Sequence, residues 1–174
     1  MTVINPEATG SYGQSTLIAV LTVADPANPS LATEINAASS VNLSFFLRDF
    51  NPTAPQNKGT APRRAGTKTQ LDKLGAVQYA VDRLRCVYAP QEAAGTDNNK
   101  ARDLLTEGTK LYIYEFPGID PDTTAITAAD LGRYHYLQLG KPVPGRSGDG
   151  EFDEYEMQLD VEYLLAPGDC TVAA

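Results

Sequence analysis

The chain has few of the residues that carry enzyme chemistry. Its 174 residues include no tryptophan, one histidine (His135) and two cysteines (Cys86 and Cys170). Ser/His/Asp and Cys/His mechanisms need a base that accepts a proton near neutral pH. His135 lies between two tyrosines in a strand-like stretch, which favours an ordinary structural histidine. We therefore expect no catalytic residues.

Motifs for ligands are missing as well. The two cysteines are far apart and lack the spacing of a zinc site or a disulfide framework, so reduced thiols are expected. The glycine-rich stretch 145–150 lacks the Lys-Ser/Thr of a phosphate-binding loop and indicates a turn. Asp149, Glu151 and Asp153 alternate as calcium ligands do, but the rest of a calcium loop is absent. The sequence predicts neither a metal ion nor a cofactor.

Long apolar runs are also absent. No stretch approaches the ~20 consecutive apolar residues that a membrane-spanning helix needs. Residues 1–7 lack the basic start and apolar run of a secretory signal. We expect a protein that does not contact membranes and that is made in the cytoplasm. Its length fits one domain with a full hydrophobic core.

Charge is distributed unevenly along the chain. The net charge of -8 disfavours binding to nucleic acid, because phosphate binding needs clustered lysine and arginine. Residues 48–85 nevertheless hold eight basic against three acidic residues, and residues 149–162 hold seven acidic residues and no basic one. The chain therefore carries two segments of opposite sign.

The secondary structure expected from the pattern is mainly β. We expect strands, rich in β-branched and aromatic residues, over 16–23, 41–47, 79–88, 109–116, 133–139 and 154–163. A helical turn capped by Ser30 is expected over 31–38, and one short helix over 97–106 with Gly108 just past its end. Because there is no βαβ rhythm, the fold class is an antiparallel β-sandwich or barrel with one short α-helix packed on it.

The last strand has the clearest alternation. One face is predicted to carry the apolar and aromatic side chains Tyr155, Met157, Leu159, Val161 and Tyr163. The other face is predicted to carry Glu154, Glu156, Gln158, Asp160 and Glu162. This acidic face is either an ordinary solvated face or a surface whose negative sign sets a local field.

The domain organisation follows from the turn-rich segments. Residues 1–14 read as an N-terminal arm, 15–165 as a single β domain, and 166–174 as a C-terminal tail. Residues 50–66 are basic, rich in proline and almost free of large apolar side chains. A segment of this length without structure of its own is uncommon in a compact domain. We interpret 50–73 as an assembly loop.

Several stretches, in their order, resemble the tail tube proteins of long-tailed, siphovirus-like bacteriophages. The family's opening resembles the first strand, the turn that begins Asp25-Pro-Ala-Asn-Pro, the helical turn up to residue 38 and then Val41-Asn-Leu-Ser. Val87-Tyr-Ala-Pro-Gln, Leu104-Leu-Thr-Glu-Gly-Thr and Leu137-Gln-Leu-Gly-Lys follow in matching order. The resemblance covers most of residues 15–165.

The resemblance implies a structural virion protein rather than an enzyme. Subunits of this family form hexameric rings around a β-barrel channel, and the rings stack into a tube through which DNA passes without specific binding. Tape-measure, tail-terminator and tail-tip proteins are the implied partners, and the tail is assembled in the host bacterial cytoplasm. The arm 1–14 and the loop 50–73 match the segments that reach the neighbouring ring.

The resemblance also gives candidate site residues. The basic residues of the inter-ring assembly loop are Lys58, Arg63, Arg64, Lys68 and Lys73. The candidates for an acidic channel or surface face are Glu154, Glu156, Asp160 and Glu162. The basic segment 48–85 is expected to meet an acidic surface of the next ring, which would fix register and speed association.

One alternative comes from another class of protein. A monomeric β-sandwich binding module, for example one for carbohydrate, fits the same fold class. Such sites usually use flat aromatic faces, and nine tyrosines could replace the missing tryptophan. A binding module would have little use for the 50–66 segment.

Overall fold

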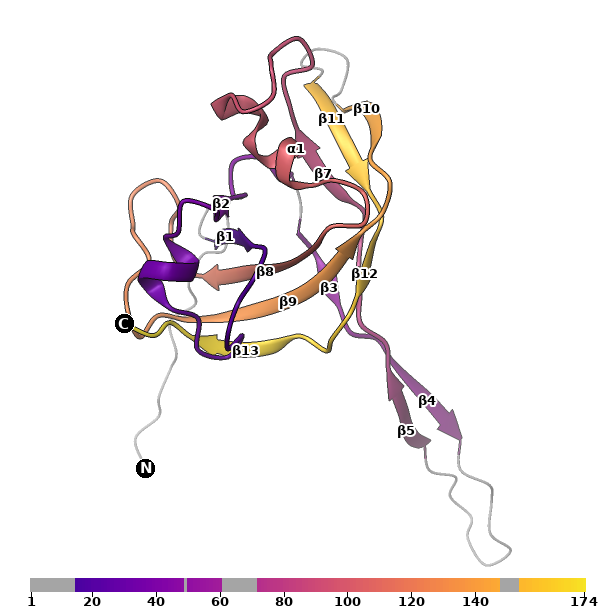
Figure 1. Cartoon of the computed structure of the whole chain (residues 1–174). Helices are drawn as coiled ribbons and strands as arrows, with labels where there is room; N and C mark the ends of the chain where they lie inside the picture. The colour runs from indigo at the N-terminus through magenta and orange to yellow at the C-terminus, as the bar shows by residue number, and fades with distance from the viewer. Residues whose placement is uncertain (1–14, 49, 61–71, 148–153) are drawn as a thin grey trace, which may run out of the picture.

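Two antiparallel sheets form the body of the molecule (Figure 1). The computed structural model describes residues 15–48, 50–60, 72–147 and 154–174. The larger sheet has six strands in the order β12-β9-β8-β1-β2, and β13 also pairs with β9. Its strands are β1 (Ser15–Val20), β2 (Val41–Asn42), β8 (Lys110–Pro117), β9 (Leu131–Leu139), β12 (Val161–Tyr163) and β13 (Gly168–Thr171).

The smaller elements surround this sheet. A three-stranded sheet has the order β10-β11-β7, made of β7 (Leu84–Val87), β10 (Val143–Ser147) and β11 (Glu154–Leu159). Two two-stranded ribbons pair β3 (Pro52–Thr53) with β6 (Ala80–Val81) and β4 (Gln56–Thr60) with β5 (Asp72–Val77). The helical elements are the π-helical turn η1 (Leu31–Ile35), the 3-10 turn η2 (Asp97–Asn99) and α1 (Lys100–Leu104), which contacts β2 and β7.

The core lies on both faces of the larger sheet. On one face, alternate residues of β1, β8 and β9 pack against β7, β11 and α1, which makes the sandwich. Leu84 of β7 and Leu159 of β11 are fully buried in this layer. On the opposite face, Tyr114 and Phe116 of β8 pack with Ile35 of η1. The predicted class, mainly β with antiparallel sheets and one short α-helix, is therefore confirmed.

Residues 41–47 differ from the predicted strand. Only Val41–Asn42 form β2, and the chain then turns, so that Phe45 is 63% exposed. The cause is local competition from side chains: the amide of Ser44 donates to Asn42 Oδ1 at 2.9 Å, and the amide of Leu17 donates to Ser44 Oγ at 2.8 Å. The alternation of apolar residues is present in the sequence. These side-chain hydrogen bonds, however, take the place of the backbone hydrogen bonds that would have continued the strand.

The stretch 154–163 is two strands rather than one. β11 belongs to the smaller sheet and β12 to the larger, and the chain passes from one to the other at Asp160, whose carbonyl accepts from the Gly140 amide at 2.8 Å. Residues 79–88 are likewise divided into β6 and β7. Because the chain crosses from one sheet to the other, each strand is shorter than predicted. The two faces predicted for a single strand over 154–163 therefore do not extend over its whole length.

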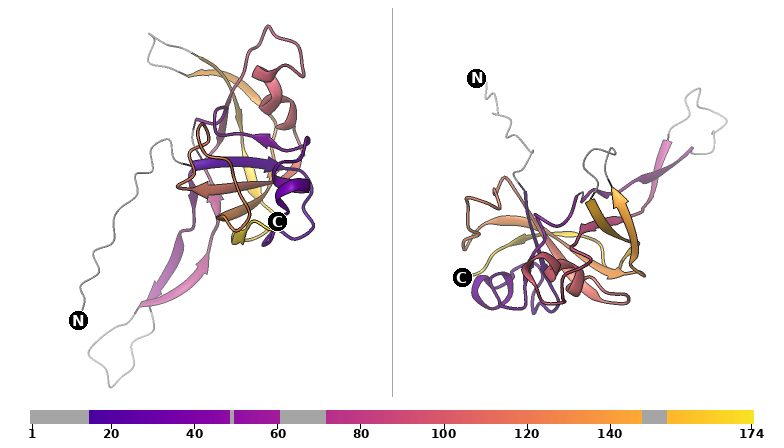
Figure 2. Two further views of the ribbon diagram at one scale, coloured as in Figure 1. Left: turned by 90° about the vertical axis from the view of Figure 1, so that its left-hand side faces the viewer. Right: turned by 90° about the horizontal axis from the view of Figure 1, so that it is seen from above.

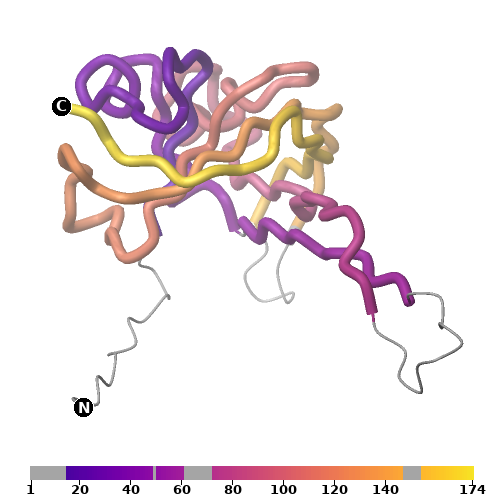
Figure 3. The backbone as a smooth tube through the Cα atoms, turned by 90° about the horizontal axis from the view of Figure 1, so that it is seen from below, coloured from indigo at the N-terminus to yellow at the C-terminus, as the bar shows by residue number. Residues whose placement is uncertain are grey.

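The sequence predicted that both ends of the chain lie outside the β domain. Residues 1–14 lie outside the described part of the chain. Beyond the predicted boundary at 165, however, Gly168–Thr171 pairs with residues 131–134 of β9 as β13. Figure 3 shows this C-terminal stretch, in yellow, running beside β9. A short polar strand such as this has no apolar alternation by which to recognise it.

The helix prediction over 97–106 agrees with η2 and α1, which cover 97–104. Gly108 follows with φ +77, a conformation that glycine adopts without strain. Neither Thr96 nor Asp97 caps the helix through its side chain. The helical segment is instead connected to the preceding loop by the buried Asn99, whose side-chain amide group forms hydrogen bonds with the backbone of Ala89 and Glu92.

We expect Leu84→Ala to lower the free energy of unfolding by about 2–5 kcal/mol, because it removes a fully buried side chain between the two sheets. Urea unfolding of the dissociated subunit measures this loss. Leu131→Ala is the matched control, since Leu131 is 71% exposed and the change should stay within about 0.5 kcal/mol. Equal losses for the two variants would contradict this assignment of the core.

Candidate assembly surface

A β-ribbon projects from the body of the molecule (Figure 2). We call β3, β4, β5 and β6 together the β-arm. Every residue of β4 and β5 is exposed, including the apolar Leu74 (68%) and Val77 (41%). An isolated two-stranded ribbon is at best marginally stable in water. The β-arm therefore exposes apolar surface that nothing in the described part of the subunit covers.

The β-arm corrects the prediction of a loop without structure over 50–66. Residues 52–53 and 56–60 are strands that pair with 80–81 and 72–77. Pairing was not visible in the sequence because the strands are polar or contain glycine, and the ladder is interrupted by a register shift between Gln56 and Lys58. Residues 61–71 lie outside the described part of the chain.

We call the end of the β-arm nearest the body, with Arg48, Phe50, Tyr79 and Arg83, its root. Aromatic rings hold the root on one side. Phe50 meets His135 of β9 edge-on with 5.0 Å between ring centroids, and Tyr79 meets Tyr163 of β12 at 6.1 Å. His135 Nδ1 lies 2.8 Å from the hydroxyl of Tyr163 and its Nε2 lies 3.7 Å from Glu115. Burial, reinforced by Glu115, raises the pKa of Tyr163 to about 12. His135 is thus buried between the root of the β-arm and Tyr163 of β12.

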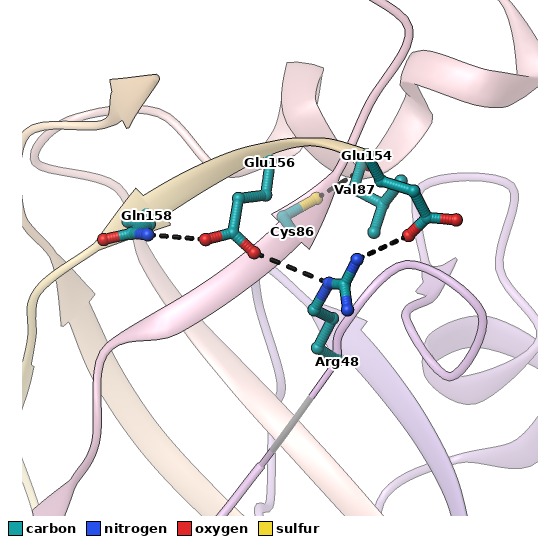
Figure 4. Close-up of polar contacts among 6 residues, drawn as sticks. All are labelled: Arg48, Cys86, Val87, Glu154, Glu156 and Gln158. Carbon is teal, nitrogen blue, oxygen red and sulfur yellow. Dashed lines mark hydrogen bonds and ion pairs between the residues drawn. The ribbon is translucent and has the colours of Figure 1, made fainter. Parts of the chain in front are cut away.

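The root is held on the other side by charged groups of β11. Arg48, four residues before β3, donates to Glu154 at 2.7 Å, and its Nε lies 3.5 Å from Glu156 (Figure 4). The Gln158 amide donates to Glu156 and accepts from Arg83 at 3.4 Å. Arg83, two residues after β6, also pairs with Asp160 at 2.8 Å. We call this set of linked side chains the polar ladder. Its members are Glu154, Arg48, Glu156, Gln158, Arg83 and Asp160.

Glu156 is the buried member of the polar ladder. It is 1% exposed, although Met157 and Leu159, rather than Glu156, face the hydrophobic core. A buried carboxylate loses hydration, and that loss is large unless a counter-charge and hydrogen bonds compensate it. Gln158 donates a hydrogen bond to Glu156 Oε1, and Arg48 supplies the counter-charge to Oε2, which has no hydrogen bond among the described residues; the stability of β11 therefore depends on the residue that precedes the β-arm.

The structure separates the four acids that the sequence grouped together. Glu154, Glu156 and Asp160 are each paired with an arginine of the same subunit, whereas Glu162 lies on β12 and has no ion pair within the described residues. Sequence reasoning missed Arg48 and Arg83 as partners of these acids. The available signal was the opposite charge of the segments 48–85 and 149–162, which was assigned to contacts between subunits alone.

The basic candidates of the assembly loop are only partly described. Lys58 lies on β4 and Lys73 on β5, and both are exposed. Arg63, Arg64 and Lys68 lie outside the described residues. The two described lysines therefore belong to the β-arm, and their role in assembly stays a prediction.

The described part of the chain also contains both cysteines. Cys86 and Cys170 are buried and not disulfide-bonded, and burial raises the pKa of their thiols to about 12 and about 11. Among the described residues there is no cluster of three metal-ligating side chains. The same part of the chain contains no helix long and apolar enough to cross a membrane.

The molecule is thus a small β-sandwich from which a β-arm projects, with β4 and β5 wholly exposed. The family model of phage tail tube proteins matches residues 2–172. The chain therefore belongs to the phage tail tube protein family, a family of structural components of the virion tail and not of enzymes. No curated protein matches the chain. Between the alternatives left by the sequence, this membership selects the tail component over the monomeric binding module.

The two arginines of the polar ladder should differ in their effect on stability. Arg48→Ala leaves the buried Glu156 without its counter-charge and should cost about 3–5 kcal/mol in the free energy of unfolding. Arg83→Ala breaks a pair in which both side chains are more than half exposed, and should cost at most about 1 kcal/mol.

Denaturant unfolding of the dissociated subunits measures both losses. Glu156→Gln added to Arg48→Ala removes the stranded charge and should recover part of the first loss. Equal effects of the two single variants would contradict the assigned burial of Glu156.

Proposed function

We propose that this chain polymerises as stacked, hexameric rings into the tail tube of a long-tailed bacteriophage, and that DNA passes through the channel without specific binding. The observation that carries the proposal is the β-arm, whose apolar side chains are exposed in the single subunit. Family membership supports the tail location. Tape-measure, tail-terminator and tail-tip proteins are the proposed partners.

The β-arm, together with residues 1–14, is proposed to reach the neighbouring ring. A head-to-tail contact repeated along one axis produces a filament rather than a closed dimer. Covering Leu74 and Val77 on the neighbour would supply the burial that the single subunit lacks. The basic charge of Lys58 and Lys73 would guide encounter with an acidic surface.

The proposed negative lining of the channel needs a broader source than β11. Glu154, Glu156 and Asp160 are paired with arginines, which reduces the field they contribute. Glu162 and the net charge of -8 remain. We therefore propose that the repulsion of DNA comes from the subunit's overall negative charge, with Glu162 as the candidate from the original four.

Negative-stain electron microscopy of the purified protein at high concentration, over a range of salt, tests the proposal. Hollow rods of uniform diameter or stacked rings are the expected result. A monodisperse monomer under every condition, even with tail-tip and tape-measure components added, would refute polymerisation.

The apolar surface of the β-arm gives a more specific test. Burial of one leucine is worth about 1.5–3 kcal/mol, so Leu74→Asp should raise the subunit concentration needed for tubes about tenfold or more. Light scattering against concentration measures this threshold. Asn57→Asp adds the same charge to the exposed strand β4 without removing apolar surface, and should change the threshold much less. If both variants assemble like the wild type, the β-arm does not mediate the contact.

The basic charge of the loop gives a second test. Arg63→Glu with Arg64→Glu should shorten the tubes and alter the salt dependence of assembly, because surface charges act mainly on register and rate and are screened by salt. Electron microscopy at low and high salt measures both quantities. Tubes of unchanged length and unchanged salt dependence would exclude an electrostatic role for this loop.

A further inference from the structure

The two ends of the β-arm are joined to one strand by separate ionic contacts. Arg48 precedes the β-arm and pairs with Glu154 and Glu156 at the start of β11. Arg83 follows the β-arm and pairs with Asp160, just past the end of β11. Gln158 connects the two halves through Glu156 and Arg83. We propose that the polar ladder is a positioning device that fixes the direction of the β-arm relative to the body before subunits meet.

Backbone contacts alone leave this direction weakly determined. The root is joined to β7 by the Arg48 amide, which donates to the Arg85 carbonyl at 3.0 Å, and by the Val87 amide, which donates to Phe46 at 2.8 Å. Beyond that point, β3 and β6 pair over only two residues each. A ribbon this short bends and twists readily, since in the described residues neither β3 nor β6 is hydrogen-bonded to a third strand. Side-chain contacts at both ends are therefore the means by which its angle can be set.

The polar ladder and the aromatic contacts act on different parts of the root. Arg48 and Arg83 fasten the root to β11, whereas Phe50 and Tyr79 rest on rings of β9 and β12. The root is thus held between the two sheets that form the sandwich. Ring contacts allow sliding and rotation, while a guanidinium held by two carboxylates has a defined orientation. The ionic contacts, of which Arg48 on the buried Glu156 is the stronger, therefore add a directional restraint to the ring contacts.

Preorganisation of this kind affects assembly, and here the inference rests on the proposed function. If the β-arm occupies the competent direction only a tenth of the time, the apparent affinity between subunits falls about tenfold. The ion pairs of the polar ladder consequently contribute to association although they lie within one subunit. The opposite charges of the segments 48–85 and 149–162 then attract each other first within the subunit. The charges that remain unpaired are available for contacts between rings.

The test measures the direction of the β-arm in dissociated subunits. Spin labels on Gly59→Cys in β4 and Lys110→Cys in β8 report the distance from the β-arm to the body by pulsed electron resonance. Both positions are exposed, and a Cβ at Gly59 meets no atom within 4 Å. The native Cys86 and Cys170 are buried, so labelling is selective. The wild type should give one narrow distance distribution.

Three variants separate positioning from folding. Arg83→Asp places a second carboxylate against Asp160 in an exposed pair and should broaden the distribution without unfolding the subunit. Adding Asp160→Arg restores an opposite-charge pair and should narrow it again. Lys100→Asp breaks the exposed Asp97–Lys100 pair, away from the β-arm, and should leave it unchanged. The combination Arg48→Gln with Glu156→Gln tests the other half without stranding a buried charge.

The outcomes for positioning and for assembly are distinguishable. A distribution that stays narrow in Arg83→Asp and in the Arg48/Glu156 combination overturns the proposal, whatever the tubes do. A broadened distribution with a raised assembly threshold supports it, and rescue of both by Asp160→Arg identifies the ion pair as the cause. A broadened distribution with an unchanged threshold overturns its role in assembly. Failure of the wild type to form tubes refutes the proposed function but leaves the distance measurement valid.

Discussion

The contact between Arg48 and Glu156 connects the stability of the sandwich to the placement of the β-arm. β11 has to satisfy two demands: Met157 and Leu159 fill the core between the sheets, while Glu156 is buried as a charge among polar partners. A buried carboxylate is tolerated only with a counter-charge, and the residue that supplies it leads directly into the β-arm. The stability of β11 in the body is therefore increased when the start of the β-arm lies against it.

The β-arm itself has the opposite property. It is made of paired backbone with almost no burial, so hydrogen bonds alone hold β4 to β5. The net value of such bonds in water is about 0.5–1.5 kcal/mol each, which does not clearly exceed the conformational entropy lost in ordering the residues. What the β-arm of the single subunit lacks is the stabilising free energy from burial of Leu74 and Val77. Covering of Leu74 and Val77 by a second subunit would add this burial to a β-arm that is already paired in the single subunit, and this is the contact that we propose for assembly.

The sequence was a good guide where periodicity and chemistry agreed. The strands β1, β8 and β9 have long apolar or aromatic patterns, and their ends lie within three residues of the predicted ones. Where local side-chain bonds intervened, as at Asn42 and Ser44, the same kind of pattern gave the wrong element. β13 and the β-arm were not recognised because pairing partners, not apolar alternation, create them. The polar ladder could not be derived from spacing, since each arginine is more than seventy residues from the side chains that it contacts and meets them only in the folded chain.

The charge pattern illustrates how far composition alone can be interpreted. Opposite charge on two segments predicts that they attract, but it does not say whether they meet within a molecule or between molecules. Here the folded chain brings Arg48 and Arg83 to β11 of the same subunit, and leaves Lys58, Lys73 and Glu162 without such partners in the described residues. Intramolecular pairs form at high effective concentration, so they are satisfied first. We therefore propose that charges left unpaired within the subunit, among them the exposed Lys58 and Lys73 of the β-arm, steer one subunit toward the next.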